Sequence, residues 1–150
     1  METFGLRPFT GSKHPVKMLL TITALIEAGT GVTLAVAPSS VVFVLLGSPL
    51  EGPASPVIAR VLGAALFSLG SACWLAREDT HVRAARGLVA AMLLYHVAVV
   101  ALLCYARIGL GMAGVALLPA AILHSALSVW CVANVRVARR KPSDNTHSRE

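Results

Sequence analysis

The sequence predicts an all-α fold: an integral membrane four-helix bundle formed by one transmembrane domain that covers residues 1–150. Hydrophobic residues make up 56% of the 150 residues and charged residues only 13%, whereas an ordinary soluble domain carries roughly 25% charged residues. The apolar residues also fall into four runs, each close to the length of about 20 residues that crosses a bilayer. Most of the chain is therefore expected to face lipid.

The first helix is expected over residues 16–37. A basic segment followed by an apolar run resembles a secretory signal, but this run is too long for one and Glu27 interrupts its centre. We predict a break at Pro38, because proline lacks the backbone donor that a continuing helix needs. Residues 41–47 are too short to span a bilayer. They are expected either to form a short interfacial helix or to extend helix one beyond a kink.

The other three helices are expected over residues 57–76, 87–105 and 114–133, each close to the spanning length. Loops rich in proline, glycine or charge separate them. The tail over residues 142–150 is polar and charged, so we expect it to be disordered.

The distribution of lysine and arginine predicts the orientation. Basic residues gather in the N-terminal segment, in the loop between helices two and three and in the tail: Arg7, Lys13, Lys17, Arg77, Arg83, Arg86, Arg136, Arg139, Arg140 and Lys141. The other two loops contain only Arg107, and Arg60 lies just inside helix two. Because cytoplasmic loops carry the excess of basic residues, both termini are expected to be cytoplasmic.

The same basic residues bear on partners. The net charge of +6 is spread over both termini and one loop, and aromatic residues make up only 5% of the chain. This pattern excludes a nucleic-acid partner and favours anionic lipid headgroups at the basic termini.

Small residues at four-residue spacing predict that helices one and two are neighbours, because small side chains let backbones approach closely in lipid. Helix two offers Ala64, Ser68 and Ala72, with Gly63, Gly70 and Ser71 nearby. Helix one offers Ala24 and Ala28, then Gly29 and Thr33.

Three titratable side chains fall at nearly the same depth in the membrane. Glu27, His96 and His124 lie near the centres of helices one, three and four, and Arg60 lies one turn inside the outer end of helix two. A charged group at the bilayer centre costs about 2.5 kcal/mol or more unless it is paired. We therefore predict that these four residues form a buried polar cluster in the bundle interior.

The cluster has several interpretations. Glu27 bonded to Thr23 or Thr30, and neutral histidines bonded to other polar groups, would serve as packing contacts only. That interpretation favours an accessory or scaffold membrane subunit without catalytic residues, in a homo-oligomer or a larger membrane complex. No enzyme motif and no cofactor motif is present in the sequence.

Two alternatives assign the cluster a chemical role. A proton-coupled small-molecule transporter would use Glu27. In the second alternative His96 and His124 would hold a b-type haem, or join Glu27 in a metal site.

Two resemblances bear on these alternatives. The segment LIEAGT, residues 25–30, resembles the first helix of small multidrug-resistance transporters, and Glu27 is the site residue that it transfers. The span over residues 17–135, with EAGTGVTLAVAP, ARVLGAALFSLGSACWLAR, RGLVAAMLLYHVAVVALL and LPAAILHSALSVWC, resembles small DoxX-like membrane proteins of bacteria. That second resemblance implies a four-helix bundle in the bacterial inner membrane and implies no activity. Such proteins often carry asparagine where this chain has His96, which makes His96 the weaker ligand candidate.

Overall fold

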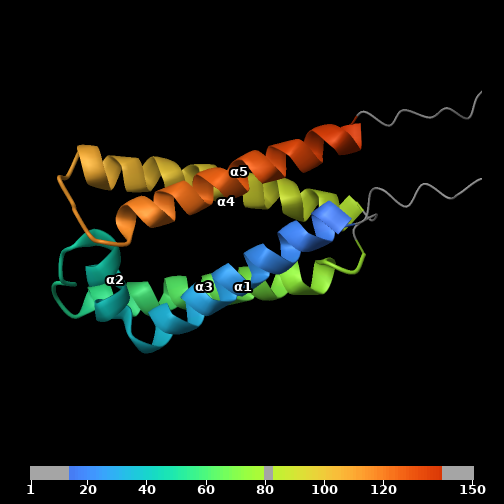
Figure 1. Ribbon diagram of the computed structural model, residues 1–150. Coiled ribbons are helices and arrows are strands. Elements are labelled where there is room, and N and C mark those ends of the chain that lie inside the picture. Colours follow the sequence, from blue (N-terminus) through green and yellow to red (C-terminus); the bar gives the residue numbers. More distant parts are fainter. Residues whose placement is uncertain (1–13, 80–82, 140–150) are drawn as a thin grey trace, which may run out of the picture.

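The computed structural model describes residues 14–79 and 83–139, and the tail predicted over residues 142–150 lies outside them. Within the described residues all regular structure is helical: α1 (His14–Val36), α2 (Pro38–Leu46), α3 (Ala54–Ala76), α4 (Arg83–Ile108) and α5 (Leu117–Arg139) (Figure 1). The predicted all-α class is confirmed. So is the presence of four helices that are long and apolar enough to cross a membrane, namely α1, α3, α4 and α5.

Helix α4 begins at Arg83 and ends at Ile108, beyond both predicted limits at residues 87 and 105. The apolar run stops at the first charged residues, but backbone hydrogen bonding continues through them. Helix α5 begins at Leu117, later than predicted, because the connection from α4 first turns through Gly111 at a φ of 67°.

A break separates α1 from α2. Ala37 leaves helical geometry with φ −128° and ψ 59°, and Pro38 then opens α2 at a position where its missing donor is harmless. Helix α2 ends at Gly47, whose φ of 75° suits glycine and whose N–H donates to the Phe43 carbonyl. The predicted break is therefore present. Residues 41–46 belong to the separate short helix α2, which Gly47 caps, at the end of the bundle remote from the start of α1 (Figure 1).

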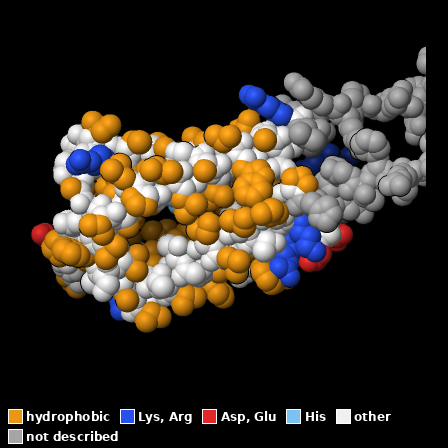
Figure 2. Space-filling view, in the orientation of Figure 1, with side chains coloured by type: hydrophobic (Ala, Val, Ile, Leu, Met, Phe, Trp, Pro, Cys, Tyr) orange, Lys and Arg blue, Asp and Glu red, His pale blue; other side chains and the backbone are white. Residues whose placement is uncertain are grey.

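Large apolar side chains are exposed along all four long helices. Examples are Leu25, Leu75, Leu94 and Val129, each between 62% and 79% exposed. Figure 2 shows apolar side chains over the middle of the visible face and lysine or arginine side chains near both ends of the bundle. This surface is compatible with a multi-pass membrane protein in a lipid bilayer.

Helices α1 and α3 pack closely along their length, as predicted, through Ala24 and Ala28 of the expected residues on α1 but through a different face of α3. A Cβ on Gly31 would lie 2.5 Å from the Phe67 nitrogen, and one on Gly70 would lie 2.6 Å from the Ala28 nitrogen. Ala64, Ser68 and Ala72, which were expected to form the contact, are exposed, as are Gly29 and Thr33. On α3 backbone contact at Gly63 and Gly70, rather than the row of alanine and serine, sets this interface.

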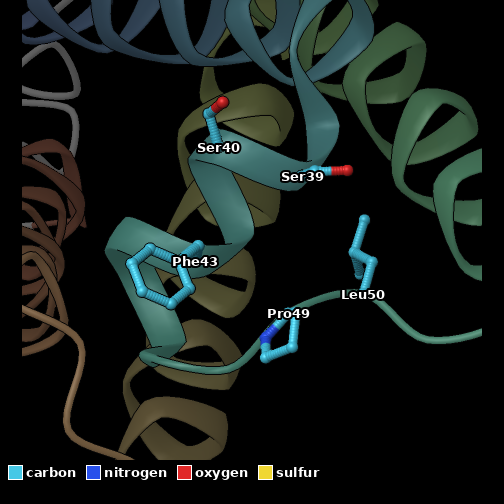
Figure 3. A pocket seen from close by; sticks show the side chains of 5 residues that line it. All are labelled: Ser39, Ser40, Phe43, Pro49 and Leu50. Atoms are coloured by element: carbon cyan, nitrogen blue, oxygen red, sulfur yellow. The ribbon is translucent and has the colours of Figure 1, made fainter.

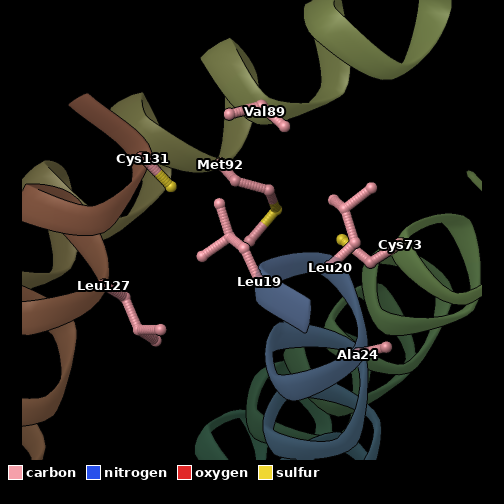
Figure 4. Packing of buried hydrophobic residues seen from close by; sticks show 8 residues of the cluster. All are labelled: Leu19, Leu20, Ala24, Cys73, Val89, Met92, Leu127 and Cys131. Atoms are coloured by element: carbon pink, nitrogen blue, oxygen red, sulfur yellow. The ribbon is translucent and has the colours of Figure 1, made fainter. Parts of the chain in front are cut away.

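The long helices form two pairs, α1 with α3 and α4 with α5, and fewer contacts join one pair to the other. At the end where the described chain begins and ends, one apolar cluster draws on all four long helices (Figure 4): Leu19, Leu20, Ala24, Cys73, Val89, Met92, Leu127 and Cys131. Toward the opposite end the apolar core divides. Leu34, Ala59 and Leu66 form a cluster within the first pair, and Leu103, Ala106 and Leu117 form one within the second.

Candidate functional site: a buried carboxylate and histidine cluster

On α1, α4 and α5 the interior stripe carries one of the titratable residues expected near the midplane. On α1 the buried positions run through Thr23, Glu27, Gly31 and Leu34; on α4 they run through Val89, Met92, His96 and Leu103; on α5 they run through Leu117, Leu127 and Cys131, with the half-buried His124 between them. Spacings of three and four residues place such positions on one helical face. The face that packs inward therefore carries a carboxylate or an imidazole on three separate helices.

These three side chains meet. One donor atom from each of Glu27, His96 and His124 lies within 4.8 Å of the others. The Nδ1 atoms of His96 and His124 are 2.9 Å apart, close enough for one to donate a hydrogen bond to the other. Their rings are tilted by 48° with centroids 5.1 Å apart. The three side chains that the sequence places at one depth therefore also lie close together in space.

The cluster is shielded from the surroundings. Glu27 is 1% exposed and His96 is fully buried, while His124 is half-buried. Among the described residues, the buried side-chain atoms without a hydrogen-bond partner are Thr23 Oγ1, Glu27 Oε1 and His96 Nε2. A buried polar atom left without a partner costs about 1–3 kcal/mol. These atoms therefore favour a ligand that supplies the missing interactions.

Tyr95 is a member of the cluster that the sequence analysis missed. Its hydroxyl donates to Glu27 Oε2 at 2.9 Å, and its ring lies edge-on to that of His124 at 5.9 Å between centroids. Neighbouring residues on a helix point about 100° apart. Tyr95 can therefore reach α1 while His96 contacts α5. The signal that could have revealed it is a midplane hydroxyl that needs a partner.

Arg60 does not join the buried set. It is exposed on α3, so the expectation of a four-residue cluster that contains it is corrected. A long aliphatic stem lets an arginine near a helix end place its guanidinium in water rather than in the apolar interior. The carboxylate of Glu27 is instead paired with the Tyr95 hydroxyl.

The histidine pair does not fit a bis-histidine haem. Such a haem needs its macrocycle between the two imidazoles, whereas His96 and His124 are in direct hydrogen-bond contact.

The same geometry fits a single metal ion. Two nitrogens that each bind an ion at about 2.1 Å lie roughly 3 Å apart when the bonds form a right angle, close to the 2.9 Å found here. One carboxylate and two imidazoles form a ligand set that proteins use for zinc and for ferrous iron.

The hollow between α2 and the loop that follows it has different chemistry. It is lined by Ser39, Ser40, Phe43, Pro49 and Leu50 (Figure 3) and has no titratable side chain. The buried cluster is therefore the candidate functional site.

Comparisons of this chain with protein-family models, with curated proteins and with solved structures found no match. The DoxX-like resemblance accordingly stays a prediction, and function has to be argued from the site itself.

Proposed function

We propose that this protein is a multi-pass membrane protein that binds one divalent transition-metal ion inside its helix bundle, with Glu27, His96 and His124 as ligands. The observation that carries the proposal is the convergence of three donor atoms within 4.8 Å, while Oε1 of the buried Glu27 carboxylate lacks a hydrogen-bond partner. A metal ion would satisfy this oxygen and neutralise the carboxylate, which is otherwise costly at this depth.

The donor set narrows the class of ion. Imidazole suits zinc, iron, copper and nickel, and a carboxylate also suits manganese. Calcium and magnesium prefer shells made entirely of oxygen. The hydrogen bond from the Tyr95 hydroxyl would then orient the Glu27 carboxylate toward the ion, as hydrogen-bonding partners of metal ligands commonly do.

The test is equilibrium binding. Purified protein in detergent is stripped with a chelator and titrated with Zn²⁺, Fe²⁺, Mn²⁺ or Ni²⁺, and bound metal is measured by elemental analysis after gel filtration. We expect one ion per chain in the unmodified protein. The His124→Asn variant should lose most of the affinity, and Cys104→Ser, which changes an exposed thiol, should keep it. Equal binding by the His124→Asn variant would refute the assignment.

A proton-coupled small-molecule transporter is the second candidate, and the hydrogen bond from Tyr95 to Glu27 favours it. A membrane-embedded carboxylate with hydroxyl and imidazole neighbours can hold and release a proton during exchange. Proteoliposomes with an imposed pH gradient test this candidate. Unchanged proton-driven flux in the Glu27→Gln variant would rule it out.

The cellular setting belongs to the same proposal. A bacterial inner membrane is what the DoxX-like resemblance implies, and both termini are expected in the cytoplasm. Lys17, Arg77 and Arg83, exposed or half-exposed at one end of the bundle, support that orientation. An accessory or scaffold subunit, in a homo-oligomer or a larger complex, remains the broad role that we expect. Purification as a monomer without a co-eluting partner would count against that role.

A further inference from the structure

The two helix pairs are joined unequally along the bundle. Near the termini the apolar cluster around Leu19 and Met92 contains side chains from all four long helices. At the other end α2 packs against both pairs, with Val41 and Val42 on one and Leu45 and Leu46 on the other. The pairs approach each other where α1 and α4 begin and diverge toward α2 (Figure 1), and a hollow opens between them on the visible face (Figure 2).

The polar cluster lies across this divide. Glu27 belongs to the α1–α3 pair, whereas Tyr95, His96 and His124 belong to the α4–α5 pair. The hydrogen bond from Tyr95 to Glu27 is a polar link from one pair to the other at this level. Any ligand bound by both Glu27 and the histidines would therefore hold the two pairs together.

We propose that the metal ion acts as a clamp: its binding draws the α1–α3 pair toward the α4–α5 pair and closes the middle of the bundle. The inference rests on the metal site proposed above. Ligand atoms around one ion, each about 2.0–2.2 Å from it, lie at most roughly 4.4 Å apart. The three donor atoms come from both pairs and lie within 4.8 Å of one another, so coordination of one ion fixes the separation of the pairs at this level.

An ion that bridges the two pairs acts on whole helices, because α1 packs closely on α3 and α4 on α5. In the first pair, backbone contact at Gly31 and Gly70 leaves α1 no room to move independently of α3. Rigid packed elements respond to a ligand by small sliding or hinge motions rather than by continuous deformation. Glu27 therefore carries α3 with it.

Spin-label distances test the clamp. Ala64 on α3 and Ala126 on α5 are exposed near the middle of their helices. Each is changed to a labelled cysteine in a Cys104→Ser background, because Cys104 is the exposed thiol among the described residues. Distances between the labels are measured by pulsed electron paramagnetic resonance in nanodiscs, with and without saturating Zn²⁺.

We expect Zn²⁺ to shorten the mean distance and narrow its distribution. In the Glu27→Gln variant, which keeps the size of the side chain and an acceptor for Tyr95, Zn²⁺ should bind at least tenfold more weakly and leave the distribution unchanged. The Glu27→Asp variant, which keeps the charge, should recover part of the narrowing.

The outcomes separate the two proposals. Zn²⁺ that binds to the unmodified site without changing the distance distribution would overturn the clamp and leave the metal site standing. Absence of Zn²⁺ binding in the labelled protein and in the unlabelled protein would overturn the metal site, and the clamp with it.

Discussion

The contact between α1 and α3 gives the sharpest structural prediction. In a Gly31→Ala variant the new Cβ would lie 2.5 Å from the Phe67 nitrogen and 2.6 Å from the Gly63 oxygen. Ordinary van der Waals contact begins at 3.4 Å, so the two backbones have to separate by the difference of about 0.9 Å. Overpacking of a tight interface of this kind typically costs about 1–3 kcal/mol. We therefore expect Gly31→Ala to lower the free energy of unfolding by that amount.

Gly29→Ala is the matched control, since it makes the same chemical change on the same helix, where a Cβ meets nothing within 4 Å. It should leave stability unchanged or raise it slightly, because alanine favours helix formation over glycine. Both variants are unfolded in mixed micelles with increasing sodium dodecyl sulfate and followed by circular dichroism.

The same substitution bears on function. Gly31 is four residues after Glu27 on the same face of α1, so displacement of α1 from α3 also displaces the carboxylate. Zn²⁺ affinity should fall in Gly31→Ala and not in Gly29→Ala. Equal unfolding curves for the two variants would refute the close-packed interface.

Three further predictions concern the cluster and the ends of the bundle. Tyr95→Phe removes the hydroxyl that donates to Glu27; Zn²⁺ affinity should fall by about 10–100-fold in a competition titration, as for other partners of metal ligands, and an unchanged affinity would remove Tyr95 from the site. The Lys17 ammonium lies 2.7 Å from Glu78, and this hydrogen bond lowers the pKa of Glu78 from 4.5. The stability that the pair contributes should be present above pH 4.5 and lost as the pH falls through the lower folded-state pKa of Glu78. The free energy of unfolding, measured at pH 7 and in acid, should therefore fall less on acidification in Glu78→Gln than in the unmodified protein. An equal fall in both proteins would contradict the link. A fluorescent protein fused to the C-terminus should fluoresce while an alkaline phosphatase fusion stays inactive, and the reverse result would contradict the cytoplasmic orientation.

Depth was predictable from the sequence, whereas rotation of the helices was not. Counting residues along each apolar run placed Glu27, His96 and His124 at one level. Whether they would meet depended on how each helix is turned about its axis. The residue pattern does not determine this rotation when every face of a helix is apolar enough to contact lipid.

The same ambiguity explains the errors. The row of Ala64, Ser68 and Ala72 looked as suitable for packing as the face with Gly63 and Gly70, and only backbone contact distinguishes them. Spacing rules assign residue types to faces and do not measure how closely two backbones approach.

For Tyr95 and Arg60, the length and direction of the side chain decide whether the residue joins the cluster. The depth of Arg60 predicts a place in the cluster, but its long side chain can also reach outward to water, and it is exposed. Tyr95 was overlooked because it adjoins His96 in the chain, although its hydroxyl reaches Glu27 from a different direction.

The most direct test of the metal site is the identity of the atoms around the ion. X-ray absorption spectra of the Zn²⁺-loaded protein in nanodiscs resolve imidazole, carboxylate and sulfur neighbours by distance and multiple scattering. The site proposed here predicts two imidazole nitrogens at about 2.0–2.1 Å and a carboxylate oxygen at about 2.0–2.2 Å, with one imidazole lost in His124→Asn. A spectrum dominated by sulfur at about 2.3 Å, or one with the same imidazole count in His124→Asn, would contradict it.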